Sequence, residues 1–304
     1  DADIAPSSVN GVTSVLLGNC GVGFAPVKPD QHQFLIELLE GVEDIPGAAL
    51  EEGMSWNWES FPEYLDELER LPRVDVLDTL RWTVDVGTQV PHAALRTYVM
   101  GDRGADVEAA ATPVEIERMS ELCEEAIRAG AMGFTSSRTS LHRTSKGEQI
   151  GTLRASADEL LGIAAALQRA DAGVIQLISD AYQSTDDDLV SREIELLGRI
   201  AAEVARPLSF TVQQNDDAPD RFRELLAAID RSTTANEWSA CAIQDCVAGC
   251  STSTPHRARR ASSASCTRAT TACTRCRTHP TTSPRLQTAS PPGQPPPARP
   301  PTSS

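Results

Sequence analysis

Short apolar segments alternate with amphipathic segments through the first 230 residues, and this order constrains the fold more than any other feature. The apolar segments are near-continuous, which is typical of parallel strands covered on both faces. Alternation of this kind predicts a parallel α/β sheet, either doubly wound or closed into a (β/α)8 barrel. The predicted strands are residues 11–17, 84–90, 132–135, 173–179 and 208–212, and the predicted helices are residues 61–71, 74–83, 112–130, 156–170, 186–205 and 217–230.

Two helix starts carry a specific signal. Thr112 is followed three residues later by Glu115, with Pro113 at the first helical position, and Ser156 stands in the same relation to Glu159. Both patterns predict a capping box, in which the two side chains bond each other's backbone N–H groups. The stretch 18–60 contains repeated turn signals, at Pro26, Pro29, Pro46-Gly47 and Gly53, and is predicted to be irregular.

The ends of the predicted strands favour the barrel over the doubly wound sheet. No G-x-G-x-x-G sequence links a strand to a helix, because Gly21-Val22-Gly23 lacks the third glycine. In a barrel the carboxyl ends of the strands carry the chemistry. Polar or reactive residues follow all five predicted strands, namely Asn19-Cys20, His92, Ser136-Ser137-Arg138, Ser179-Asp180 and Gln213-Gln214-Asn215.

The composition changes abruptly near residue 235. Residues 239–304 contain ten prolines, eight arginines and a single acidic residue, so this segment carries a charge of +7 against −23 for residues 1–238. Its few large aliphatic side chains cannot offset the entropy of ordering the chain. We therefore divide the chain into an incomplete barrel domain, 1–234, and a disordered low-complexity tail, 235–304. Out-of-frame translation of a G+C-rich gene yields the same mixture of residues, and we favour it as the origin of this tail.

Charge and cysteine usage exclude several classes of function. The acidic body lacks the clustered positive surface that nucleic-acid binding requires. The sequence contains no run of about 18 apolar residues, so it predicts no membrane span. Only Cys20 and Cys123 lie in the body, which indicates a reducing compartment, the cytoplasm, rather than a disulfide framework.

Five segments, in order, resemble one family. They are GVTSVLLGNCGVGFAPV, WNWESFPEYLDELE, VPHAALRTYVMGDRGA, AIRAGAMGFTSSRTSLHR and RPLSF. Together they are similar to the D-aminoacylase (N-acyl-D-amino-acid deacylase) group of the amidohydrolase superfamily. The resemblance implies a (β/α)8 barrel and a zinc-dependent hydrolase that cleaves the linear amide of a small N-acyl amino acid.

The resemblance also implies roles for individual residues. Cys20 matches the strand-end cysteine that binds zinc in this family, and a thiolate is a suitable ligand for Zn²⁺. His92, Ser136, Arg138 and His142 match the region that contacts substrate, where an arginine can pair with a carboxylate. On the sequence alone, Cys20 also fits a small apolar residue at a strand end, and the other four fit capping or solvated loop residues.

The sequence departs from the family pattern at several positions. The family's His-x-His pair lies upstream of the first matching segment, and its catalytic aspartate lies beyond the last. The ends of the strands 173–179 and 208–212 have no histidine. We therefore expect the chain to be a fragment, covering about strands two to six of the barrel, that is inactive by itself. The alternative is a non-catalytic, barrel-derived binding protein with a basic disordered tail.

Overall fold

The structure, a computed structural model, describes residues 5–70, 73–74, 79–80, 82–213, 218–236 and 241–244. The chain divides into two units, Asp1–Arg259 and Arg260–Ser304, and every described residue belongs to the first. The strands of that unit are β1 (Ser14–Leu17), β2 (Arg73–Val74), β3 (Thr79–Leu80), β4 (Asp85–Thr88), β5 (Val90–Pro91), β6 (Gly133–Arg138), β7 (Val174–Ser179), β8 (Leu208–Thr211) and β9 (Cys241–Gln244).

Helices follow most of these strands. The α-helices are α1 (Ala5–Val9), α2 (His32–Glu43), α3 (Gly47–Gly53), α4 (Phe61–Arg70), α5 (His92–Met100), α6 (Pro113–Ala129), α7 (Ala157–Ala170), α8 (Asp187–Val204) and α9 (Arg221–Asn236). Four short 3-10 helices connect other elements: η1 (Asn19–Gly21), η2 (Gly101–Gly104), η3 (Gly151–Arg154) and η4 (Asp180–Tyr182).

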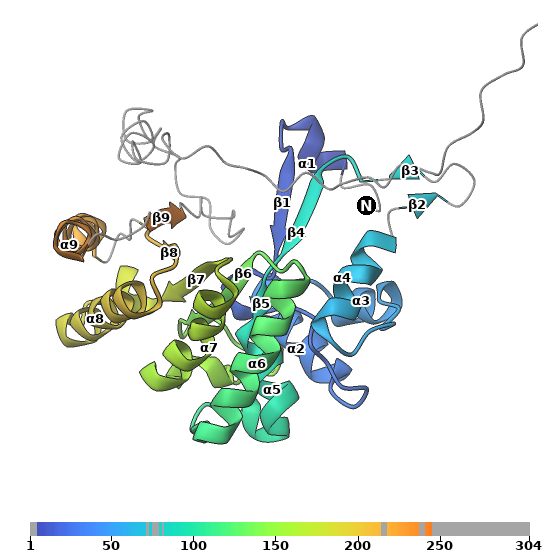
Figure 1. Cartoon of the computed structure of the whole chain (residues 1–304), viewed down its shortest axis with the longest axis horizontal. Coiled ribbons are helices and arrows are strands. Elements are labelled where there is room, and N and C mark those ends of the chain that lie inside the picture. Colours follow the sequence, from blue (N-terminus) through green and yellow to red (C-terminus); the bar gives the residue numbers. More distant parts are fainter. Residues whose placement is uncertain are drawn as a thin grey trace, which may run out of the picture. The chain divides into compact units, whose positions relative to one another are not determined.

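The main sheet is parallel and follows chain order, β5-β6-β7-β8-β9 (Figure 1). A second pair, β1-β4, is also parallel, with Leu17 opposite Thr88. Only Gln89 separates β4 from β5, so the segment 85–91 pairs with β1 along its first part and with β6 along its second. Parallel neighbours in chain order, joined by helices, are the βα units that build a barrel.

Helices α5 to α8 lie in chain order along one side of this sheet (Figure 1). Side chains from β6, β7 and β8 pack with these helices into one core, which includes Phe134, Leu177, Met119, Ile163 and Ile200. Their burial supplies the main stabilisation, because apolar area removed from water is worth about 25 cal/mol per Å². The bounds of these elements confirm the five predicted strands. They also confirm the predicted helices at 61–71, 112–130, 156–170, 186–205 and 217–230.

Three sequence predictions are wrong. The segment 74–83 is not one helix, because β2 and β3 pair antiparallel there, with Val74 opposite Thr79. The stretch 18–60 is not irregular throughout, since it contains α2 and α3. The second capping box forms only in part: Ser156 accepts a bond from the Glu159 N–H, but the Glu159 side chain is used elsewhere.

The first capping box forms as predicted. The Glu115 N–H donates to Oγ1 of Thr112, while the Thr112 N–H donates to the Glu115 carboxylate at 2.7 Å. The predicted domain boundary at 234/235 stays a prediction. Helix α9 runs past it to Asn236, and β9 lies beyond it, paired with β8. Most of the predicted tail falls outside the described residues.

Candidate functional site

The candidate site is built around a turn that follows β1. Gly18, Cys20 and Gly21 all have left-handed backbone conformations, with φ of 83°, 59° and 72°. This conformation is rare for a residue with a Cβ atom, so Cys20 is the strained member of the turn. A Cβ on Gly21 would lie 2.9 Å from the backbone of Ser136 and Ser137, so glycine allows the turn to press against β6.

Two side chains of the sheet hold this turn. The Cys20 N–H donates to Oε1 of Gln176 on β7 at 3.0 Å, and the Gly21 N–H donates to Oγ1 of Thr135 on β6 at 3.0 Å. The Thr135 hydroxyl in turn donates to the carbonyl of Gly18. We call the face of the sheet that carries Thr135, Ser137 and Gln176 the turn face. These bonds place Cys20 over the turn face of β6 and β7.

The loop after β6 brings a histidine to the same face. Oγ of Ser137 lies 2.8 Å from Nδ1 of His142. The Asp180 carboxylate, at the end of β7, holds this loop by accepting bonds from the Thr139 hydroxyl and the Ser140 N–H. Burial lowers the pKa of His142 to about 4, although the charge of Asp180 opposes the shift. His142 is therefore neutral at neutral pH.

Ser136 lies on the opposite face of β6, which we call the helix face, and there it contacts His92, the first residue of α5. His92 Nδ1 lies 2.8 Å from the Ser136 hydroxyl, and Nε2 lies 3.0 Å from Oε1 of Glu159 on α7. Neither His92 nor Ser136 has exposed surface. Burial lowers the pKa of His92 despite the neighbouring carboxylate, so the neutral ring donates from Nε2 and accepts at Nδ1.

Arg138 pairs with another helix. Its Nε and NH2 groups donate to the two carboxylate oxygens of Glu193 on α8, at 2.8 and 2.7 Å. The Ser179 hydroxyl donates to the same carboxylate at 2.8 Å. The structure thus joins His92 to Ser136, pairs Arg138 with Glu193, and brings His142 to Ser137 on the other face. The substrate-binding role of these four residues stays a prediction.

The described residues do not fit a complete metal site. Within the described ranges, no three His, Cys, Asp or Glu side chains lie close enough together to hold one ion. Cys20 is half-buried and is the candidate ligand on the turn face. Cys123, by contrast, is fully buried in α6, where burial raises the pKa of its thiol to about 12, as expected for a core residue.

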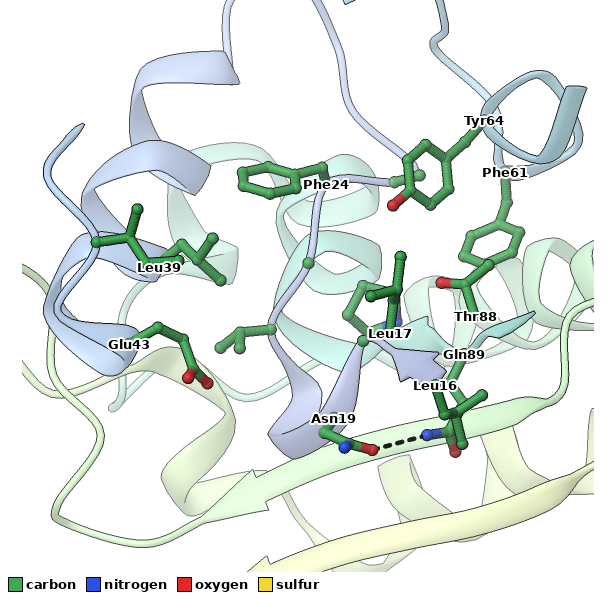
Figure 2. Close-up of a pocket in the computed structure, with 16 residues that line it drawn as sticks. Leu16, Leu17, Asn19, Phe24, Leu39, Glu43, Phe61, Tyr64, Thr88 and Gln89 are labelled. Atoms are coloured by element: carbon green, nitrogen blue, oxygen red, sulfur yellow. Dashed lines mark hydrogen bonds between the residues drawn. The ribbon is translucent and has the colours of Figure 1, made fainter. Parts of the chain in front are cut away.

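A cavity lies beside the turn, between β1, α2 and α4 (Figure 2). It has a volume of about 330 Å³ and an apolar lining that includes Leu17, Phe24 and Phe61. At its floor the Gln89 amide donates to Oδ1 of Asn19 at 3.0 Å (Figure 2). Cys20 is not among the residues that line it.

Two polar residues that contact the candidate site residues, Gln176 and Glu159, were not singled out from the sequence. For Gln176, the signal in the sequence is a single amide side chain inside the apolar run 174–178. Glu159 looked like a capping residue, because its spacing from Ser156 satisfies the local pattern. Only the tertiary structure shows that its carboxylate turns toward His92.

Comparison with known proteins places the chain in a family. A sequence model of the Amidohydrolase family matches residues 1–272. This chain belongs to the amidohydrolase family. Among curated relatives, the amidohydrolase chain is similar to D-aminoacylase of Alcaligenes xylosoxydans xylosoxydans, with 34% identity over 133 residues. N-acyl-D-aspartate deacylase of the same organism is 30% identical over 133 residues. Each match covers 44% of this chain and 22% of the relative.

Solved structures agree on the fold. A crystal structure of D-aminoacylase superposes with a TM-score of 0.57 at 23% identity, covering 80% of this chain and 43% of that one. A D-aminoacylase mutant in complex with copper chloride gives a TM-score of 0.56. The partial-barrel prediction and the resemblance to the D-aminoacylase group are confirmed. This amidohydrolase chain spans about a fifth of the length of the curated relatives it matches.

The structure also bears on the membrane prediction. Among the helices of the described residues, none combines the length and apolar character needed to cross a bilayer.

Proposed function

We propose that this chain is part of a metal-dependent amidohydrolase that cleaves the linear amide bond of a small N-acyl amino acid. The observation that carries the proposal is the placement of Cys20. Its turn is bonded to β6 and β7 on the turn face, with a neutral histidine, His142, on the same face. Similarity to D-aminoacylase and N-acyl-D-aspartate deacylase supports the substrate class.

We propose further that Cys20 supplies one thiolate ligand to zinc. One of the similar solved structures concerns the binuclear metal centre of D-aminoacylase, which supports a metal in the parent enzyme. A thiolate is anionic and soft, and therefore a good ligand for Zn²⁺. The described residues contribute no complete ligand set, so this proposal requires the remaining ligands to come from outside them.

The same reasoning predicts that the present chain is inactive. Metal-dependent hydrolysis of an amide requires a metal ion that converts bound water into hydroxide. It also requires a group that transfers a proton to the leaving amine. His142 is a neutral imidazole on the turn face, and its Nδ1 is already bonded to Ser137. Within the part of the chain that the structure describes, no three His, Cys, Asp or Glu side chains gather closely enough to hold a metal ion that would generate the hydroxide.

The test compares this chain with the longer protein encoded by its flanking genomic sequence. Both are assayed with zinc on N-acetyl-D- and N-acetyl-L-amino acids. We expect no hydrolysis by the chain and hydrolysis by the longer protein. Cys20→Ser in the longer protein should abolish that activity, whereas Cys123→Ser should preserve it. Full activity after Cys20→Ser, or no activity in the longer protein, would reject the proposal.

A further inference from the structure

Gln176 carries a buried donor without an acceptor. The residue is 3% exposed, and its Nε2 atom finds no hydrogen-bond partner among the described residues. Buried amide groups in folded proteins nearly always have a partner, so such an exception calls for a specific explanation. A missing water or ligand is the usual one.

The orientation of this amide is fixed by its neighbour. Oε1 of Gln176 accepts from the Cys20 N–H at 3.0 Å. Exchanging the amide oxygen and nitrogen would set two donors against each other, so the nitrogen cannot take that place. Because the two amide heteroatoms share one carbon, Nε2 also lies next to the Cys20 turn.

Gln176 stands in a polar row across the turn face. It is in register with Thr135 on β6 and with Ser209 on β8. Layers inside a (β/α)8 barrel are dominated by bulky branched apolar residues, so a row of Thr, Gln and Ser is unusual for packing alone. The Thr135 hydroxyl already accepts from Gly21 and donates to Gly18, which leaves it committed to the turn.

We propose that Gln176 is a substrate-binding residue whose Nε2 donates a hydrogen bond to the acyl carbonyl oxygen of an N-acyl amino acid. This inference rests on the proposed function and adds a residue to the same site. A neutral carbonyl suits a neutral amide donor. A buried carboxylate would need a cation, and Arg138 already pairs with Glu193.

The test follows the side-chain amide of Gln176 by NMR in the chain as it exists. Gln-selective ¹⁵N labelling, with Gln176→Glu and Gln176→Met as assignment variants, identifies the Nε2 signals. Three probes are titrated: N-acetyl-D-alanine, N-acetyl-D-alanine amide, which lacks the carboxylate, and D-alanine, which lacks the acyl carbonyl. We expect saturable shifts with both acetylated probes and none with D-alanine.

Affinity for the acetylated probes should fall about tenfold in Gln176→Glu, as expected for the loss of one hydrogen bond. The control Gln168→Glu adds the same charge at an exposed position on α7 and should leave affinity unchanged. Signals that do not move, or that move equally with D-alanine, would overturn the inference. If the Gln176 signals respond but the longer protein hydrolyses no N-acyl amino acid, only the proposed function fails. If the longer protein hydrolyses N-acyl amino acids but the Gln176 signals do not respond, only the role of Gln176 is rejected.

Discussion

Arg96 and Glu159 form an ion pair inside the protein, with Nε 2.7 Å from Oε1 and both side chains 1% exposed. Glu159 Oε1 also contacts His92 Nε2 at 3.0 Å. Burial alone would raise the pKa of Glu159, but the His92 hydrogen bond and the Arg96 charge hold it below its ordinary value. The guanidinium also donates to the carbonyl of Gly151 at 2.6 Å, so one cluster joins α5, α7 and η3.

Removing one member of this pair should destabilise the fold strongly. Arg96→Met leaves the Glu159 carboxylate buried without its cation, and such losses cost about 3–5 kcal/mol of unfolding free energy. Chemical denaturation measures the change. The control Arg118→Met breaks an exposed pair with Glu121, which should cost no more than about 1 kcal/mol. Equal effects of the two variants would contradict the buried network.

Stability should fall as the pH drops from 6.5 toward 4, in part because of His142. The unfolded chain binds a proton at this side chain near its ordinary pKa of 6.5, whereas the folded chain resists protonation until about 4. The unfolded state therefore gains protons first, and the loss from this group is at most about 1.4 kcal/mol per pH unit. His142→Gln should make the stability less dependent on pH in this window. Unchanged pH dependence in that variant would show that His142 does not contribute.

Gly21→Ala should disrupt the turn that carries Cys20. The new Cβ would both strain a positive φ and meet the backbone of β6 at 2.9 Å. Gly147 is the matched control, because its φ is 81° but no atom lies within 4 Å of an added Cβ. Gly147→Ala should cost about 1–2 kcal/mol from backbone strain alone, and Gly21→Ala should cost clearly more. Thermal unfolding measures the loss of stability in both variants. The difference between the two losses reports the steric contact of the new Cβ with β6, and equal losses would contradict it.

The two body cysteines should differ in reactivity. Cys20 is half-buried, whereas Cys123 is fully buried and has a pKa of about 12. Since the thiolate is the reactive form, iodoacetamide at pH 8 should modify Cys20 at least about tenfold faster in the folded chain. Peptide mass spectrometry resolves the two sites. Similar rates under native conditions would mean that Cys20 is as inaccessible as Cys123.

Local patterns predicted local structure well. The Thr112 capping box and the strand at residues 173–179 depend on neighbours in sequence, and both form. The pattern at Ser156 fails in part because a buried guanidinium and imidazole compete for Glu159. Helix α5 is absent from the predicted elements, although the interpretation of His92 as a capping residue already placed a helix after it.

The candidate site was predictable only as a set of strand ends. Chain order placed Cys20 and His142 near one edge of the sheet, but it could not tell which of Ser136 and Ser137 faces the turn. That assignment depends on register, since a shift of one residue exchanges the two faces of a strand. Gln176 contacts Cys20 across 156 positions of sequence, a separation that periodicity does not encode.

Both proposals require that the Cys20 turn lies against the side of β7 that carries Gln176. A short bifunctional thiosulfonate applied to the variants Gln176→Cys and Leu177→Cys tests this directly, with the cross-linked peptides identified by mass spectrometry. Leu177 is the matched control because it is buried on the helix face. We expect a cross-link from Cys20 to position 176 and none to position 177. A cross-link to position 177 in equal or greater yield would contradict this placement of the turn.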